Sequence, residues 1–196
     1  REKVRVGEVA ITRSEYYENE DCAMMQCLDD RIGCMIIIDS ILRDVKNTND
    51  MYYVFSVQEE IGCFGAQTST FDLQPDLFVT FDVASTGDEL RGFRTDVKLV
   101  GCAGIKVMDY FMIVNQYVVD ALVDVAEKNG IKYQIEVSEN GGTDAHTAQL
   151  VRGGMKAGAI TIPTRNIHSR DEIICKEDIL DCIRMAMALE TVELDE

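Results

Sequence analysis

The sequence has few basic residues and no long apolar run. Its 19 Lys and Arg residues stand against 35 Asp and Glu residues, which gives a net charge of −16. This charge repels phosphate backbones and anionic lipid headgroups, so nucleic acid and membrane surfaces are disfavoured as partners. No apolar run approaches the length that spans a bilayer, and the charged start, REKVRVGE, is not a secretory signal. We therefore expect a cytoplasmic protein.

Cysteine pairs with metal-binding spacing are also missing. The seven cysteines are an odd number and include no CxxC pair or other zinc-finger spacing. We therefore expect reduced, mostly buried thiols, and neither a disulfide framework nor a structural thiolate zinc site. The two histidines, His146 and His168, are too few for a site built mainly from imidazole groups. The 196 residues, 46% of them hydrophobic, suffice for one core and one domain.

Apolar runs alternate along the chain with segments of helical periodicity. Runs of β-branched, aromatic and small apolar residues predict strands at 52–57, 77–83, 132–137 and 157–162. A charged and apolar alternation predicts a further strand, or strand pair, at 1–12. Helical spacing and caps predict helices at 28–45, 62–71, 111–129 and 177–189, with a short helix inside 141–154. Segments 13–26, 85–104 and 163–169 are expected to be loops. This alternation predicts an α/β fold with a mostly parallel sheet covered on both faces.

Two adjacent acids, Glu59 and Glu60, directly follow the predicted strand 52–57. In open α/β sheets ligands bind at the carboxyl ends of the strands, on loops that the sheet positions rigidly. Two carboxylates there can divide the chemistry, one binding a metal ion and the other acting on water as general base. Alternatively, both glutamates complement the dipole of the helix that follows.

Three other side chains could join this pair: Asp29 at a predicted helix start, Asp82 at a strand end, and His168 in a late loop. Carboxylates with one imidazole are the ligands expected for zinc, cobalt or manganese. Each feature is also common in other roles, since acids often cap helices, as Asp29 or Asp30 would here. A single loop histidine is usually a surface group.

Five sequence blocks add a resemblance to a known family. LDDRIGC, VQEEIGCFGA, FDVASTGD, GGTDA and PTRNIHS, in this order, resemble the signature blocks of the tetrahedral aminopeptidases, family 42 of the metallopeptidases. That family includes proteins called glutamyl aminopeptidase, deblocking aminopeptidase and cellulase M. The resemblance implies a three-layer α/β/α fold with a mixed sheet of the zinc-dependent exopeptidase type. It also implies removal of amino-terminal residues from peptide substrates.

The resemblance also implies roles for individual residues around two divalent ions, zinc or cobalt, with manganese as another candidate. Asp29 would bridge the two ions, Glu60 and His168 would complete one site, and Asp82 would bind the other ion. Glu59 would be the catalytic general base. Substrate contacts would come from the GGTDA block and from the loop before His168, namely from Gly142, Thr143, Asp144 and Arg165. The GGTDA block is alternatively a turn and helix cap, and Arg165 a solvated side chain or a contact to a neighbouring subunit.

The family carries two parts that this sequence does not match. One is an upstream segment with a His-x-Asp motif, whose histidine completes the second metal site; the other is an inserted β-rich domain that builds dimers and larger shells. We therefore expect residues 1–12 to be the tail of that inserted domain or a leading strand, and residues 13–196 to be a partial catalytic domain. The sheet should lack its N-terminal strands and expose an edge or apolar face. We expect one ion or none to be held firmly by this chain, and the full-length protein to be a homo-oligomer.

Two smaller departures concern the cleft beside His168. Asn166 stands where the family usually has tyrosine, and Arg170 where it usually has proline. Two hypotheses follow from the whole sequence: a two-metal aminopeptidase of which this chain carries most of the site, or a non-catalytic binding or assembly module, or inactive fragment, with the family fold. A sugar hydrolase using paired carboxylates is weaker, because adjacent glutamates do not readily flank one glycosidic bond.

Overall fold

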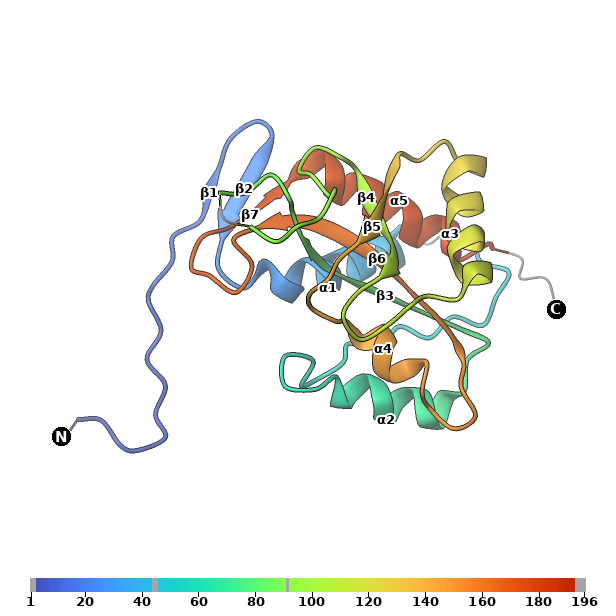
Figure 1. Cartoon of the computed structure of the whole chain (residues 1–196), viewed down its shortest axis with the longest axis horizontal. Helices are drawn as coiled ribbons and strands as arrows, with labels where there is room; N and C mark the ends of the chain where they lie inside the picture. Colours follow the sequence, from blue (N-terminus) through green and yellow to red (C-terminus); the bar gives the residue numbers. More distant parts are fainter. Residues whose placement is uncertain (1–2, 44–45, 91, 193–196) are drawn as a thin grey trace.

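The structure is a computed structural model that describes residues 3–43, 46–90 and 92–192 (Figure 1). A seven-stranded sheet forms its centre, in the order β1-β2-β7-β6-β4-β5, with β3 paired to β6. The strands are β1 (Tyr17–Glu18), β2 (Cys22–Met25), β3 (Leu77–Ser85), β4 (Ala103–Met108), β5 (Tyr133–Val137), β6 (Lys156–Arg165) and β7 (Glu172–Cys175). The helices are α1 (Leu28–Leu42), α2 (Phe64–Leu73), α3 (Gln116–Lys128), α4 (Asp144–Ala148) and α5 (Lys176–Leu189).

The sheet is mixed. Its longest ladder is parallel and pairs β3 with β6 from Leu77 opposite Lys156 to Ser85 opposite Thr164. Strands β4 and β5 are also parallel, whereas β4–β6, β6–β7, β2–β7 and β1–β2 are antiparallel. The α/β class predicted from the sequence, with a mixed sheet and helices, is confirmed. The sheet is not mostly parallel as predicted, because four of its six described pairings are antiparallel.

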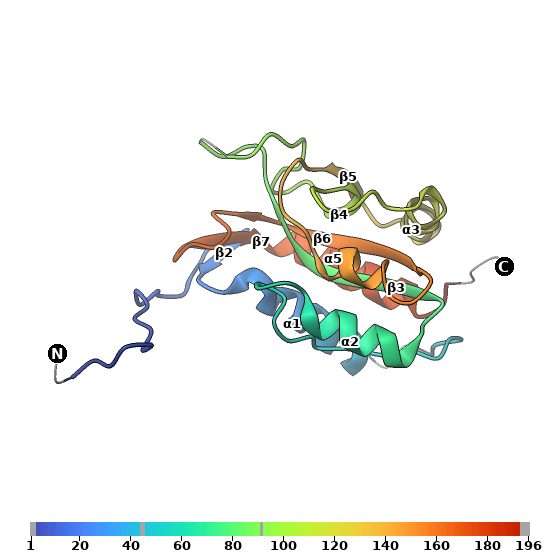
Figure 2. The same ribbon diagram turned by 60° about the horizontal axis from the view of Figure 1, so that its bottom comes forward.

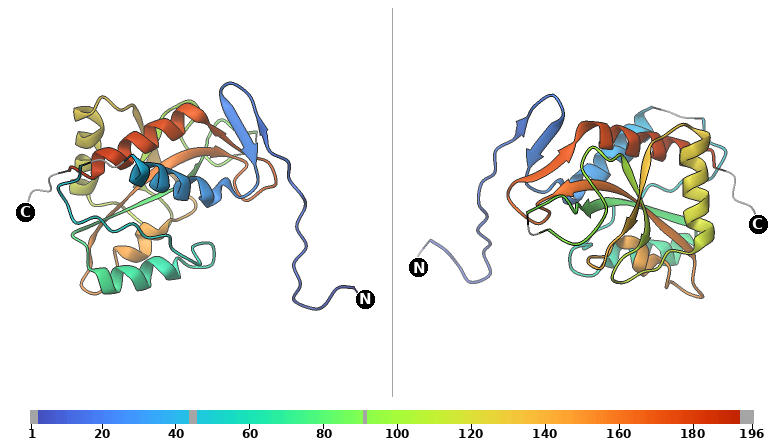
Figure 3. Two further views of the ribbon diagram at one scale, coloured as in Figure 1. Left: turned by 180° about the vertical axis from the view of Figure 1, so that it is seen from behind. Right: turned by 45° about the horizontal axis from the view of Figure 1, so that its top comes forward.

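Helices lie on both sides of this sheet. Figure 2 shows α1 and α2 below strands β3 and β6, with α3 beside β4, and Figure 3 shows α1 and α5 side by side. The close approach of α3 to β6 depends on Gly158, where a Cβ atom would lie 2.7 Å from Cγ1 of Val118. Fully buried apolar side chains from both layers fill the core, among them Ile36, Ile105, Leu122, Ile160, Ile162 and Ile174. No helix in the described part of the chain is long and apolar enough to cross a membrane.

Most predicted helices and strands are present, with shifted ends. The first helix covers Leu28–Leu42, and the predicted end at 44–45 lies outside the described residues. Helix α3 starts at Gln116 rather than at residue 111. The reason is local: Oδ1 of Asp109 accepts hydrogen bonds from the backbone N–H groups of Phe111 and Met112 and turns the chain there.

The predicted strand at 52–57 is wrong. These residues belong to no helix and to no strand of the described sheet, and Tyr52 and Val57 are 57% and 66% exposed. High β-propensity shows that a segment suits a pleated, half-buried surface, but it does not supply a neighbouring strand. Along its other edge β3 pairs with no described strand. An exposed edge and exposed apolar residues agree with what the sequence predicted.

The strand predicted in the segment 1–12 and several loop predictions are also wrong, while the assignment of this segment to an inserted domain stays a prediction. Described residues 3–12 form no strand, and residues 1–2 lie outside the described part. Conversely, strands β1 and β2 occupy the predicted loop 13–26, and β4 begins inside the predicted loop 85–104. The strand pattern of β4 is obscured because it contains a glycine and Lys106, a charged residue that is buried by pairing with other charges.

Candidate metal centre

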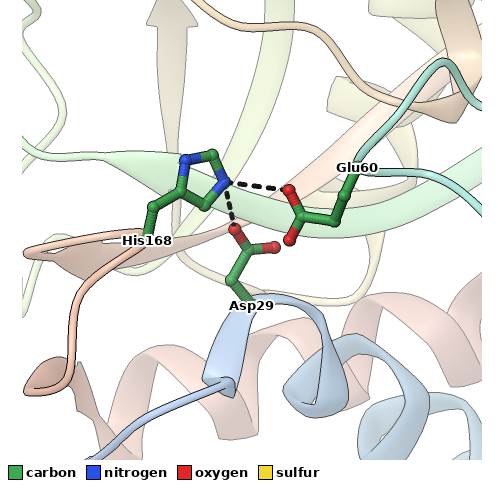
Figure 4. A group of neighbouring side chains, drawn as sticks. All are labelled: Asp29, Glu60 and His168. Carbon is green, nitrogen blue, oxygen red and sulfur yellow. Dashed lines mark ion pairs between the residues drawn. The ribbon is translucent and has the colours of Figure 1, made fainter. Parts of the chain in front are cut away.

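Three side chains from distant parts of the chain converge at one point (Figure 4). Nε2 of His168 lies 2.9 Å from Oδ2 of Asp29 and 3.1 Å from Oε2 of Glu60. Asp29 comes from the start of α1, Glu60 from the turn before α2, and His168 from the loop between β6 and β7. The structure therefore brings together three of the four metal ligands that the sequence predicted.

A fourth acid, Glu172 at the start of β7, holds two of these segments in place. Its Oε2 accepts hydrogen bonds from the backbone N–H groups of Leu28, at 2.7 Å, and Asp29, at 3.1 Å. Its Oε1 accepts a hydrogen bond of 2.9 Å from the backbone N–H of His168. Glu172 is 2% exposed, so this one carboxylate ties the chain at Asp29 to the chain at His168. The sequence analysis did not identify Glu172, because no spacing rule shows which backbone groups a carboxylate will meet.

Tight backbone turns present the glutamates and the histidine. Gln58, Cys63 and His168 all have positive φ angles, of 62°, 53° and 61°. Between the first two, the carbonyl oxygen of Glu59 accepts hydrogen bonds from the backbone N–H groups of Gly62 and Cys63. Left-handed conformations of residues other than glycine cost about 1 kcal/mol or more each and are concentrated at functional sites. These turns bring the side chains of Glu60 and His168 together, whereas an uninterrupted helix would carry them apart.

The site concentrates carboxylates that disfavour one another's charge. Burial, reinforced by the charge of Glu60, raises the pKa of Asp29 to about 6. Burial raises the pKa of Asp30 to about 8, although its Oδ1 accepts a hydrogen bond from the backbone N–H of Gly33 that acts in the opposite sense. Burial and the charges of Asp30, Glu59 and Asp29 raise the pKa of Asp82 well above its usual range. A bound cation would offset this repulsion directly.

The donor set fits a divalent ion. Two carboxylate oxygens and one imidazole nitrogen are the ligands that zinc, cobalt and manganese accept, and three protein ligands leave a position for water or substrate. Asp82 is buried, and its Oδ1 accepts a hydrogen bond of 2.8 Å from the backbone N–H of Val83. Within the described residues it does not join the convergent group of Asp29, Glu60 and His168. Its role as ligand of a second ion stays a prediction.

Glu59 points to a different group of side chains from its neighbour Glu60. Its Oε1 accepts a hydrogen bond from Sγ of Cys63 at 3.4 Å, and a carboxylate oxygen of Asp144 lies within 4.8 Å of both. Burial, with the charge of Asp144 adding to it, raises the pKa of Glu59. A carboxyl group with a raised pKa next to a metal centre suits proton transfer near neutral pH.

The predicted substrate-contact residues are divided between two places. Asp144 joins Glu59, while Thr143 at the start of α4 is buried and makes no capping hydrogen bond with its side chain. At Gly142 a Cβ atom would lie 2.6 Å from Cδ2 of Phe111, so the backbone approaches that ring closely. Arg165 instead pairs with Asp88, with 3.3 Å between Nε and Oδ1, and this contact raises the pKa of the guanidinium.

Comparisons with known proteins extend these observations. A profile of the M42 glutamyl aminopeptidase family matches residues 1–185. The chain is 36% identical over 182 residues to a putative aminopeptidase of Acetivibrio thermocellus, covering 93% of this chain and 55% of the relative.

Solved structures give the same result. An aminopeptidase of the archaeon Desulfurococcus kamchatkensis superposes with a TM-score of 0.91 at 32% identity, over 98% of this chain and 56% of that one. The TET1 peptidase of Pyrococcus horikoshii, described as assembling into a tetrahedron or a large octahedral shell, superposes with a TM-score of 0.86 at 28% identity. That match covers 97% of this chain and 56% of the peptidase. The chain thus spans about half the length of the relatives it matches.

Proposed function

The chain belongs to the M42 glutamyl aminopeptidase family, and from this premise we propose that it carries the metal centre of an aminopeptidase acting on peptides. The convergence of Asp29, Glu60 and His168, with Glu59 beside them, supports the proposal most directly. In the proposed reaction a water molecule hydrolyses the first peptide bond of the substrate.

Three residues would hold the ion and one would move the proton. Asp29, Glu60 and His168 supply the ligand atoms, and His168 must be neutral to bind through Nε2. When bound, a divalent ion supplies Lewis-acid chemistry, because it polarises the peptide carbonyl and lowers the pKa of water. Glu59 accepts the proton of the attacking water at its carboxylate and returns it to the leaving amine nitrogen. The raised pKa of Glu59 favours the first of these transfers, because it makes the carboxylate a stronger base toward the attacking water.

A second ion is part of the proposal. Asp29 has a second carboxylate oxygen and can bridge, and Asp82 would be the other ligand of the second ion. Two protein ligands make a weaker site than three, so we expect the second ion to be held less firmly. Zinc, cobalt and manganese all suit these donors, and the native metal among them is to be measured.

The substrate and the assembly are proposed with less detail. Gly142, Thr143 and Asp144 would shape the cleft next to Glu59, and Arg165 would act from the end of β6, where it pairs with Asp88, or at a subunit contact. The TET1 peptidase of Pyrococcus horikoshii forms large shells, which supports homo-oligomerisation of the full-length protein. The composition favours a cytoplasmic location. The side chain preferred at the substrate's first position is left to the assay.

The test combines metal content with turnover. Metal-depleted protein is reconstituted with zinc, cobalt or manganese, its metal content is measured, and its activity is assayed on a panel of aminoacyl chromogenic substrates. We expect turnover that Glu59→Gln lowers by about 10²- to 10⁴-fold while the ion at Asp29, Glu60 and His168 is retained, because the variant removes the base but none of these three ligands. An inactive protein that binds no ion would favour the non-catalytic module instead.

A further inference from the structure

A second group of potential ligands contains Glu59 and shares no side chain with the metal centre. It consists of Glu59, Cys63 and Asp144, whose ligand atoms all lie within 4.8 Å of one another. None of these atoms belongs to the group formed by Asp29, Glu60 and His168. The two groups differ chemically, because only this second one contains sulfur.

The spacing of the second group matches the coordination sphere of a small ion. For tetrahedral zinc, bond lengths of about 2.3 Å to sulfur and 2.0 Å to oxygen place the two ligand atoms about 3.5 Å apart. The observed distance from Sγ of Cys63 to Oε1 of Glu59 is 3.4 Å. His146 lies next to the group, with its Nδ1 3.8 Å from the same sulfur, but this nitrogen is 2.7 Å from the carbonyl oxygen of Thr143 and is held there as a donor. Three protein ligands therefore remain, with a fourth position for water.

Asp144 supplies an independent sign that a ligand is expected. It is 6% exposed, and its Oδ1 is buried without a hydrogen-bond partner in the described part of the chain. Its other oxygen, Oδ2, accepts a hydrogen bond from Oγ of Ser56. Leaving a buried carboxylate oxygen unpaired costs about 1–3 kcal/mol, and more when the group is charged. A cation between Asp144, Cys63 and Glu59 would satisfy it.

We propose that Glu59, Cys63 and Asp144 form a separate binding site for a thiophilic divalent ion such as zinc, cobalt or cadmium. Thiolate ligands favour these ions over manganese, magnesium and calcium, which prefer oxygen. Binding replaces the proton of the Cys63 thiol by the metal ion, and the proton is released to solvent. Because Glu59 becomes a ligand, the ion also occupies the group that is proposed to act as general base. The inhibition that follows rests on the proposed aminopeptidase function, whereas the binding does not.

The binding is tested by absorption spectroscopy without substrate. Metal-depleted protein is first given excess manganese to fill the oxygen- and nitrogen-rich centre, and is then titrated with cobalt. Cobalt bound to a thiolate gives a charge-transfer band in the near ultraviolet, and the site of Asp29, Glu60 and His168 has no sulfur to produce one. We expect a band that saturates at one cobalt ion per chain. The band should be absent in Cys63→Ser and unchanged in the control Cys102→Ser. In Asp144→Asn the cobalt affinity measured from the band should fall at least about tenfold.

Inhibition is the second readout. Each variant's rate, relative to its own uninhibited rate, is measured with manganese at the catalytic centre and increasing zinc. We expect the zinc concentration that inhibits the wild type and Cys102→Ser to be at least about tenfold lower than the concentration that inhibits Cys63→Ser. A wild-type protein without the cobalt band, or a band that persists in Cys63→Ser, overturns the proposed site. Absence of turnover with the band present overturns the aminopeptidase proposal and leaves the metal site standing.

Discussion

Replacing Glu172 should separate the folding of the chain from the assembly of its metal centre. Glu172 contacts neither the imidazole nor the carboxylates of the centre, but it accepts hydrogen bonds from the backbone at Leu28, Asp29 and His168. In Glu172→Ala these N–H groups lose a charged acceptor. A hydrogen bond to a charged group contributes about 1.5–3 kcal/mol, and the group at Leu28 is buried, so we expect a loss of about 3–5 kcal/mol in the free energy of unfolding.

Glu172→Gln is the more informative variant. It keeps the size of the side chain and one acceptor oxygen, but an amide nitrogen cannot accept the remaining N–H groups. The chain at Asp29 and the chain at His168 are then no longer fixed by the same group. Mutation of a group that orients metal ligands typically lowers metal affinity by about 10- to 100-fold, and we expect the zinc affinity of Glu172→Gln to fall by this factor.

The assays are calorimetric titration of metal-depleted protein with zinc and thermal melting with and without the ion. A matched control is Glu139→Gln, which makes the same change at an exposed position. We expect this control to bind zinc like the wild type. If Glu172→Gln also keeps wild-type affinity within about twofold, the carboxylate does not position the ligands and the reasoning is refuted.

Two further predictions concern the buried charges. Lys106 is 3% exposed and lies 2.7 Å from Oε1 of Glu136 and 3.4 Å from Oδ2 of Asp109, so Lys106→Met should lower the free energy of unfolding in urea by about 3–5 kcal/mol. Lys128→Met, which removes the exposed pair with Asp124, should lower the free energy of unfolding by less than about 1 kcal/mol. Equal losses in the two variants would show that the Lys106 pairs contribute no more than an exposed pair. In the metal-free protein the raised pKa values of Asp29, about 6, and Asp30, about 8, mean that the folded state binds more protons than the unfolded state above pH ~4. The melting temperature of the metal-free protein should therefore fall as pH rises from about 4 to 8, and saturating zinc should reduce this fall. A metal-free melting temperature that rises over this range would show that Asp29 and Asp30 are not held in the buried arrangement.

The sequence predicted the α/β class and the positions of most helices because these depend on local periodicity and on caps. It failed where structure depends on a neighbour that is distant in the chain. The apolar run 52–57 reads as a strand by propensity, but no described strand pairs with it. Strand β4 was missed for the opposite reason, because Lys106 looks like a loop residue until Glu136 and Asp109 are known to face it.

The candidate site shows the same division at the level of single side chains. The family resemblance implied the roles of Asp29, Glu60 and His168, because residue type alone cannot assign adjacent acids. At the first pair the backbone decides: Asp30 turns back to the N–H of Gly33, while Asp29 faces His168.

At the second pair the tight turn after Gln58 sends Glu60 toward His168 and Glu59 toward Cys63 and Asp144. Neighbouring carboxylates therefore face different partners, and in the proposed mechanism this gives chemically similar residues different tasks. A glutamate that binds the ion would be fixed by it, whereas a glutamate that is partly buried next to a second acid keeps a raised pKa and can exchange a proton. The same contacts open Glu59 to competition in the proposed second site. Asp144, which together with burial raises the pKa of Glu59, and Cys63, whose hydrogen bond lowers it, are both potential ligands of a thiophilic ion.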